Sequence, residues 1–503
     1  MITSKFRPVI CLATVNKNFV RTVAVNKTVQ TENTQSLRSW KEVPGPSSLP
    51  LIGQLHHFLP GGDLSNIAST DFIELLYNKF GPLVRLQGFF GASDIYFLYD
   101  AESTAQILRS EDNMPVRPGF PSLDYYRRSK VKENEPTGLI TDHGELWKQF
   151  RSTVNPVMLQ PKTIKLYSGQ LDEVAQDMIK RMRSIRGEDN ILKGNFDMEM
   201  NLWALESIGL VALGCRLNCF DPNLPEDSPA KKLIQLVHDM FKVANELDFK
   251  PSMWRYYPTK TFKKAMKMYE DQATVARYFV DKSIEELKVK RKTEDQKGIL
   301  EKLLEINKEV ALIMASDMLF AGVDTAANTI TATFYLLAKN QEKQDKLREE
   351  LKSDSEKRPY LRACIKESLR LMPVVAGNFR MTTKEHNVLG YLLPKGTHVS
   401  FVHQTMAIQD KHFPRPKEFL PERWIVSKDD PLYHGNAHPF ANMPFGFGVR
   451  SCIGRRIAEL EIETFLARAI QNFKVEWFGP PIQVSPSSLN YITGPFNFVF
   501  KDV

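Results

Sequence analysis

The chain has 503 residues and a formal net charge of +8, and it is several times longer than a typical single domain. Its sequence nevertheless shows no internal linker, repeat or low-complexity tract. Its cysteines are few, scattered and odd in number, which excludes a disulfide scaffold and favours a reducing compartment. They are Cys11, Cys215, Cys219, Cys364 and Cys452.

The first 40 residues are basic and poor in acids. Six lysines and arginines stand against Glu32 alone, a balance of +6 − 1 = +5 out of the total of +8. The segment contains no apolar run near the roughly 20 residues that a spanning helix needs. This composition predicts a mitochondrial transit peptide over residues 1–36 and a folded domain over 37–503, while a disordered basic tail is the alternative. The turns around Pro44-Gly45-Pro46 mark the entry to the folded domain.

Two short motifs have the spacing of one helical face. Trp147 and Arg151 are four residues apart, and Glu367 and Arg370 are three apart, so each pair projects from one side of a predicted helix. An arginine can bind a carboxylate through two donors. The second pair, taken alone, is equally consistent with a surface salt bridge of about 0–1 kcal/mol.

Residues 311–338 form a long, mostly apolar stretch with helical character. Its length alone suggests a membrane span. Because Asp317, Asp324 and Asn328 lie within it, and charges are costly at bilayer depth, a buried central helix is the better interpretation. Thr325 can interrupt the local backbone ladder by bonding to a carbonyl or to water.

The segment Phe445–Gly454 presents a single thiol on a glycine-bent loop. Gly446 and Gly448 can adopt backbone conformations closed to other residues and leave room for a flat group. Cys452 stands just before a predicted helix, whose positive end is expected to lower the pKa of the thiol. A structural buried cysteine is the alternative for an arbitrary position.

The pattern Phe-Gly-x-Gly-x-Arg-x-Cys-x-Gly at 445–454 resembles the haem-binding signature of the cytochrome P450 family, and the resemblance extends from about Pro44 to the C-terminus. It implies a mainly α fold with a minor β-sheet region, in which haem b lies between the central helix and the cysteine loop. It also implies that the Cys452 thiolate is the metal ligand. Strands are predicted at residues 83–86, 398–402 and 496–500.

The same resemblance assigns roles to the other motifs. It implies that Trp147, Arg151, Arg450 and Arg380 contact the haem propionates and that Phe445 and Gly446 shape the cofactor loop. It places Asp324 and Thr325 at the oxygen-activation site, where protons must be supplied by an acid with access to water. It also implies that Glu367 and Arg370 join Arg423 in a buried network below the haem.

The sequence is similar to the mitochondrial branch of the family, and most similar to its insect members. That similarity implies that Arg362, Lys366, Arg455 and Arg456 dock an acidic iron–sulfur ferredoxin, although a solvated basic face is the generic alternative. The expected function is a monooxygenase on the matrix side of the inner membrane that uses O2 on a lipophilic xenobiotic or steroid-like substrate. A microsomal-type monooxygenase and a non-catalytic haem sensor or carrier are the alternatives.

The resemblance also predicts the substrate pocket and a membrane contact. The pocket is expected from residues 116–128, 374–377 and 492–496 and from Met318, Phe320 and Ala321. The loop 250–264 alternates aromatic and basic residues, so Trp254 and Phe262 are expected to dip into the membrane, the alternative being aromatics packed on the core. Cys215 and Cys219 lack further metal-ligand partners and are predicted to be core residues.

Overall fold

The structure is a computed structural model. It describes residues 37–49, 52–62, 64–65, 69–88, 93–192, 195–250, 252–289, 293–353, 357–486 and 489–503. Arg38–Val503 form one compact unit. The predicted transit peptide at 1–36 lies outside the described residues.

Helices make up most of this unit. They are α1 (Ser69–Phe80), α2 (Ala101–Arg109), α3 (Pro121–Arg128), α4 (Gly144–Met158), α5 (Pro161–Lys165), α6 (Ser168–Ile185), α7 (Phe196–Leu213), α8 (Pro229–Asp248), α9 (Lys260–Val289), α10 (Ile299–Ile306), α11 (Lys308–Lys339), α12 (Gln341–Leu351), α13 (Pro359–Leu371), α14 (His403–Met406) and α15 (Arg455–Asn472).

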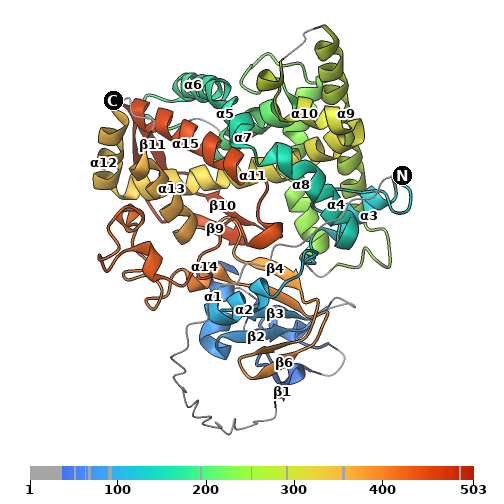
Figure 1. Cartoon of the computed structure of the whole chain (residues 1–503). Coiled ribbons are helices and arrows are strands. Elements are labelled where there is room, and N and C mark those ends of the chain that lie inside the picture. Colours follow the sequence, from blue (N-terminus) through green and yellow to red (C-terminus); the bar gives the residue numbers. More distant parts are fainter. Residues whose placement is uncertain are drawn as a thin grey trace, which may run out of the picture. The chain divides into compact units, whose positions relative to one another are not determined.

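The strands form small sheets, as the sequence predicted. They are β1 (Arg38–Ser39), β2 (Leu83–Leu86), β3 (Ile95–Leu98), β4 (Asn378–Met381), β5 (His386–Val388), β6 (Tyr391–Leu393), β7 (His398–Phe401), β8 (Phe473–Trp477), β9 (Gln483–Pro486), β10 (Asn490–Gly494) and β11 (Phe498–Asp502). The largest sheet has the order β2-β3-β7-β4, and β1-β6-β5 lie with it at the lower end of Figure 1.

Helix α11 is the central element of the fold, as predicted. Asn307 caps its N-terminus by accepting a hydrogen bond from the backbone N–H of Glu309 at 2.7 Å. The helix packs against α7, α9, α13 and α15 and crosses the middle of the unit (Figure 1). In the part of the chain that the structure describes, α11 alone is long and apolar enough to cross a membrane. Its Leu319, Val323 and Phe334 are fully enclosed, however, so it is a core helix.

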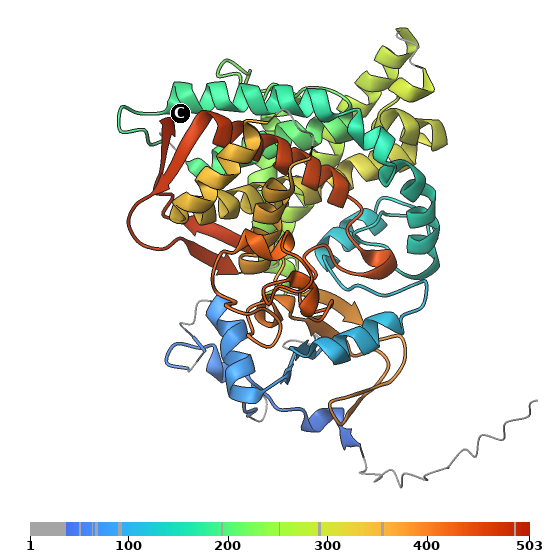
Figure 2. The same cartoon turned by 60° about the vertical axis from the view of Figure 1, so that its left-hand side comes forward.

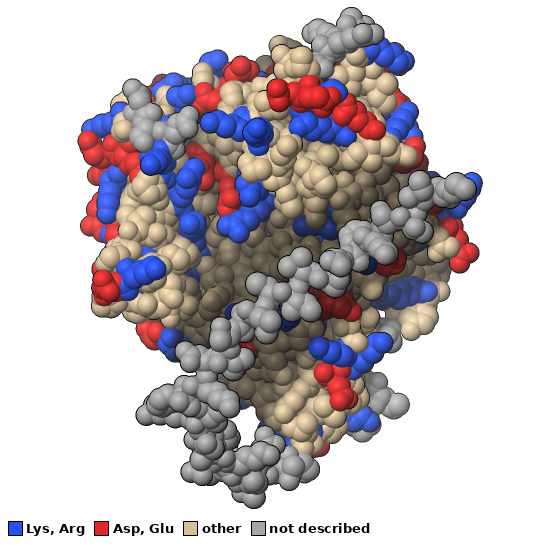
Figure 3. Space-filling view, in the orientation of Figure 1, with Lys and Arg blue, Asp and Glu red and all other residues tan. Residues whose placement is uncertain are grey.

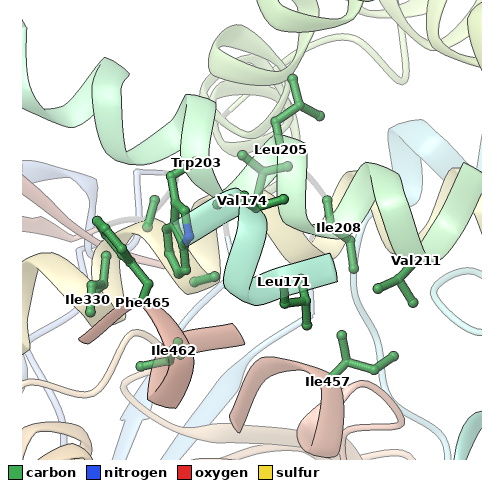
Figure 4. Close-up of a cluster of buried hydrophobic side chains, with 14 of the residues drawn as sticks. Leu171, Val174, Trp203, Leu205, Ile208, Val211, Ile330, Ile457, Ile462 and Phe465 are labelled. Atoms are coloured by element: carbon green, nitrogen blue, oxygen red, sulfur yellow. The ribbon is translucent and has the colours of Figure 1, made fainter. Parts of the chain in front are cut away.

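The main hydrophobic core joins α11 to α6, α7 and α15. Figure 4 shows Trp203 of α7 beside Phe465 of α15, whose rings stack at 4.6 Å between centroids. Burial of each such aromatic side chain contributes about 1.5–3 kcal/mol. Figure 2 shows α6 lying along α15. This packing fixes the start of α15, and therefore the loop that precedes it.

Candidate functional site

The loop before α15 is closed by its own backbone. The N–H of Cys452 donates to the carbonyl of Phe445 at 2.9 Å. Gly446 and Gly448 have φ values of +74° and +67°, in the left-handed region where a side chain would be strained. A Cβ at Gly446 would also lie 3.0 Å from Oδ1 of Asn378. Both glycines that the sequence singled out are therefore required by the turn.

The Cys452 thiol is deep in the protein but remains accessible. Its side chain is exposed, although protein groups surround it on most sides. Burial raises the pKa of this thiol, while the N–H of Gly454 and the guanidinium groups of Arg117, Arg151 and Arg455 oppose that rise. The prediction of a lowered pKa was wrong for the free thiol, because desolvation exceeds the helix-end effect. A metal ion bound to the sulfur would remove the proton outright.

Four arginines form one charge cluster, because Arg117, Arg151 and Arg380 all act on the charge of Arg450 (the arginine cluster). Arg117 and Arg151 also act on the Cys452 thiol. Burial, and then the charges of the other three, lower the pKa of Arg450 to about 8. Burial also lowers the pKa of Arg151 to about 10, with Arg117 contributing. Cations lower one another's pKa in this way when they lack enough negative charge between them.

Arg450 is fixed by three backbone carbonyls. Its guanidinium donates to Pro115 at 3.1 Å, to Leu139 at 3.1 Å and to Asp142 at 2.8 Å. It also lies over the ring of Trp147, 3.9 Å from the centroid. Trp147 and Arg450, which are far apart in the sequence, therefore form one unit.

In the described part of the chain, Arg151 keeps one donor without a partner, whereas Arg380 pairs with a carboxylate. Arg151 donates to the carbonyl of Ser451 at 3.0 Å, and its Nε is buried without a partner among the described residues. Nε of Arg380 lies 2.7 Å from a Glu111 carboxylate oxygen. Asp142 and Asp317 also act on the cluster, but they pair with Arg128 and Arg127. The cluster therefore keeps excess positive charge and fits a group that carries two carboxylates. The donor set therefore suits the propionates of a haem.

Arg117 is a member of this cluster that sequence reasoning assigned only to the general pocket segment 116–128. It is half-buried, and burial together with Arg380 lowers its pKa. A signal was present, since an arginine stands between two prolines in the otherwise apolar stretch Pro115-Val116-Arg117-Pro118. A charged side chain held in such a segment requires a partner of opposite charge.

Helix α11 presents an accessible face within its buried length. Ala321 is exposed and Gly322 and Thr325 are half-buried, whereas most of their neighbours on the helix are buried. The Thr325 hydroxyl donates to the carbonyl of Ala321 at 2.8 Å. A Cβ at Gly322 would lie 2.7 Å from the Ile208 side chain, so α7 approaches closely here.

Asp324 faces away from that accessible side. Its carboxyl is 2% exposed and accepts a hydrogen bond from the Tyr491 hydroxyl at 2.9 Å. Burial raises the pKa of Asp324 to about 7, and the Tyr491 hydrogen bond acts in the opposite direction. The sequence predicted an acid with access to water; in the structure β10 covers the carboxyl, and Tyr491 donates the hydrogen bond to it. Tyr491 was not among the predicted residues.

The buried network around Glu367 is present as predicted. The Glu367 carboxylate accepts from Arg370 at 2.7 and 2.9 Å and from Nε of Arg423 at 3.0 Å. It also accepts from the indole N–H of Trp424 at 2.9 Å and from the backbone N–H of Leu420 at 3.1 Å. The charged side chains are fully buried, so α13 and the segment at 420–424 are locked together.

The cations predicted to bind a partner are all exposed, on α13 and the start of α15. We call Arg362, Lys366, Arg455 and Arg456 the cationic face. Arg362 pairs with Glu463 at 3.0 Å, which joins α13 to α15, and Arg455 pairs with Glu459 at 2.8 Å. Four cations and two carboxylates leave a charge of +4 − 2 = +2 on these residues.

Three of the predicted pocket elements meet in one apolar cluster, namely residues 116–128, Phe320 and residues 374–377. Phe320 of α11 packs edge-on against Phe120 at 5.1 Å, and against Phe241 of α8 at 4.4 Å. Val374 belongs to the same cluster. Met318 and Phe496 instead pack against the main core. The contribution of α8 was missed, because only the tertiary fold brings it there.

A small cavity lies beside β10. Its volume is ≈ 60 Å³. Its lining residues are Asn328, Leu371, Met372, Pro373, Val374, Gln404, Val484, Asn490 and Ile492. Three amide side chains among them make it polar enough for water.

The loop between α8 and α9 is held on the protein by aromatic residues that were expected to face outward. Trp254 is 8% exposed, donates to the carbonyl of Leu247 at 3.0 Å and stacks on Phe262 at 5.2 Å. Trp254 therefore packs on the protein, as the alternative expected, and Phe262 is half-buried against it. Tyr256 and Tyr257 are each 66% exposed.

Comparison with known proteins gives a consistent result. The sequence model described as Cytochrome P450 matches residues 43–492. Cytochrome P450 CYP12A2 of Musca domestica is 39% identical over 506 residues, covering 94% of each chain. Probable cytochrome P450 12a5, mitochondrial, of Drosophila melanogaster is 37% identical over 493 residues, covering 93% of this chain and 91% of the relative.

Two solved structures share the fold. The cytochrome P450DA heme domain aligns with a TM-score of 0.73 and 20% identity, covering 92% of this chain and 97% of that one. The retinoic acid bound cyanobacterial CYP120A1 aligns with a TM-score of 0.68 and 22% identity, covering 93% of this chain and 100% of that one. The predicted fold class is confirmed.

Proposed function

Since the chain belongs to the cytochrome P450 family and is a haem-thiolate monooxygenase, we propose that it works in mitochondria with a ferredoxin as its electron donor. Relatives at 37% and 35% identity carry mitochondrial in their names. The basic segment 1–36 is then the transit peptide, and the enzyme acts on the matrix side of the inner membrane. The observation that carries the choice of electron donor is the cationic face.

The residues around the cysteine loop would hold the haem. Cys452 would supply the sulfur ligand, on a loop that turns at Gly446 and is closed by the hydrogen bond from its N–H to the carbonyl of Phe445. The arginine cluster and Trp147 bind the two propionates and so fix the orientation of the ring. When bound, the haem supplies the iron chemistry that activates O2.

The accessible face of α11 would supply protons to oxygen. Thr325 places a hydroxyl on that face, anchored to the carbonyl of Ala321. Asp324 is the neighbouring acid, and a pKa of about 7 lets its carboxyl both take up and release a proton near neutral pH. The Thr325 hydroxyl would therefore orient a proton at the site, and the Asp324 carboxyl would exchange protons with that region.

The cationic face suits a small acidic protein. It lies on the exposed side of α13 and α15, and Arg455 is within 5.1 Å of the Phe445 ring on the cysteine loop. Docking there would bring a redox partner close to the sulfur ligand. Lys366 and Arg456 have no carboxylate partner in the described part of the chain, so they remain available to a partner's acids.

Charge reversal at Lys366 tests the electron donor. With a mitochondrial-type ferredoxin, its reductase and NADPH, Lys366→Glu is expected to slow reduction of the enzyme about tenfold, and rising salt should slow the wild type. Stopped-flow reduction measures both effects. Lys288→Glu on α9 makes the same charge change at a distant exposed pair and should leave the rate unchanged. A wild-type rate that ignores salt and survives Lys366→Glu would contradict the proposal.

We also propose that the loop between α8 and α9 contacts the inner membrane. Its outward residues are Tyr256, Tyr257 and Met253, the last 46% exposed, with Lys260 and Lys263 beside them. Aromatic rings favour the headgroup level of a bilayer and lysines favour anionic lipid. Trp254 and Phe262 support the loop from beneath.

Flotation with cardiolipin-containing vesicles tests this contact. A chain that begins at residue 37 keeps the whole compact unit and should float with the vesicles. Replacing Tyr256 and Tyr257 by serine should release most of it, because the headgroup contacts are lost. Tyr278→Ser with Phe478→Ser removes two other exposed aromatic residues as the matched control. If the Tyr256 and Tyr257 variant floats as well as the control, another surface binds the membrane.

The substrate is proposed to be lipophilic. The cluster around Phe120, Phe241, Phe320 and Val374 is apolar, and the hollowed centre of the face in Figure 3 is mostly uncharged. Such linings discriminate modestly between similar apolar molecules. Product analysis over a panel of steroids and plant or synthetic toxins, with the ferredoxin system, identifies which are oxidised.

A further inference from the structure

Strand β10 covers the carboxyl of Asp324. Three consecutive residues of β10 are tied to other elements. Asn490 donates through its amide to the carbonyl of Pro373 at 2.7 Å and to Gln404 at 2.8 Å. The backbone N–H of Ile492 donates to Oδ1 of Asn328 at 2.9 Å. Tyr491 stands between them, so the place of its hydroxyl is determined by neighbours on both sides.

The same contacts hold one turn of α11. Nδ2 of Asn328 donates to the backbone carbonyl of Asp324 at 2.8 Å, while its Oδ1 accepts from Ile492. The Tyr491 hydroxyl donates to Oδ2 of Asp324 at 2.9 Å. Two adjacent residues of β10 thus bind two residues one turn apart on the helix. Asp324 is therefore held both at its backbone carbonyl and at its carboxyl group.

Few other groups affect the protonation of the Asp324 carboxyl. Among the described residues, Tyr491 is the one ionisable group that acts on it, and no cation does. A buried carboxylate without hydrogen bonds is strongly disfavoured relative to the neutral acid. The phenol is therefore the group on which the ionised form depends.

We propose that Tyr491 is a positioning residue for the reaction, which holds the Asp324 carboxyl on β10 and keeps it able to exchange protons behind Thr325. This inference rests on the proposed role of Asp324 and Thr325. Phenol donation stabilises the carboxylate, and burial stabilises the neutral acid. The two effects oppose each other, so the carboxyl exchanges protons near neutral pH. Without the phenol it would release its proton only at higher pH.

Loss of the Tyr491 hydroxyl is expected to move the titration of Asp324 to higher pH. Because the hydrogen bond from Tyr491 lowers the pKa of Asp324, Tyr491→Phe should raise that pKa from about 7, by about one unit or a tenfold change in proton affinity. Tyr99→Phe is the matched control, since it removes a buried tyrosine hydroxyl that bonds to the carbonyl of Ile73 at 3.0 Å. Asp324→Asn removes the carboxyl.

Two measurements on the haem-loaded full chain test the inference. Infrared pH titration should show a carboxyl band near neutral pH that is lost in Asp324→Asn, moves to higher pH in Tyr491→Phe and stays in place in Tyr99→Phe. The pH profile of electron coupling, measured as product against hydrogen peroxide, should move in the same direction in Tyr491→Phe. A carboxyl midpoint that is unchanged in Tyr491→Phe, or that moves equally in Tyr99→Phe, overturns the inference.

The infrared titration needs no turnover, so it separates this inference from the proposed function. A shifted carboxyl with no ferredoxin-supported product would support the role of Tyr491 toward Asp324 and contradict the electron donor. Ferredoxin-supported product with an unshifted carboxyl would support the electron donor and contradict the role of Tyr491.

Discussion

Cys452→Ala is expected to reduce monooxygenase activity to background. The sulfur of Cys452 is the one thiol on the accessible loop before α15, and the other described cysteines, Cys215, Cys219 and Cys364, lie elsewhere in the chain. Without a thiolate the iron loses the ligand that favours O–O cleavage. The spectrum of the reduced protein with carbon monoxide measures this directly, since a thiolate ligand gives a strongly red-shifted Soret band.

A second cysteine variant controls for general damage. Cys215→Ala removes a half-buried thiol at the end of α7 and should keep the red-shifted band and the activity. A Cys452→Ala protein that still showed that band would contradict the ligand assignment. Loss of the band in both variants would indicate that the fold, and not the ligand, had been lost.

Glu367→Ala is expected to destabilise the protein more than any surface change. It removes the one carboxylate between Arg370 and Arg423 and leaves both guanidinium groups buried, at a cost of about 3–5 kcal/mol. Native domains are stable by only about 5–15 kcal/mol, so the loss is a large fraction of the total. Chemical unfolding followed by circular dichroism measures the difference.

An exposed ion pair provides the comparison. Glu285 and Lys288 lie 2.6 Å apart on the exposed surface of α9, so Glu285→Gln should change the free energy of unfolding by at most about 1 kcal/mol. If Glu367→Ala were no more harmful than Glu285→Gln, the buried network would not hold the fold together.

Local sequence patterns predicted the elements that carry the site. The 3.6-residue period and the apolar length of 311–338 predicted a central helix, and α11 spans Lys308–Lys339. The strand at 83–86 matches β2, whereas the last strand begins at Phe498 and not at Phe496. Strand ends depend on pairing with another segment, which local spacing does not contain.

The motifs identified residue types, and the tertiary structure decided their surroundings. The glycines before Cys452 have positive φ, which is a local backbone property and could be predicted from the sequence. Whether Asp324 meets water or a phenol depends on β10, which lies over 160 residues later in the chain. The same holds for Arg117 beside Arg380.

The sequence by itself determined the family and the helices that present the motifs, and it singled out Cys452 as the candidate sulfur ligand, because these depend on short spacings and on residue chemistry. Only the tertiary structure decided which side chains share a charge environment. It turned Trp254 inward, joined α8 to the apolar cluster and placed Tyr491 on Asp324. The physical reason is that burial and charge interactions act through space, between residues whose separation along the chain does not limit them.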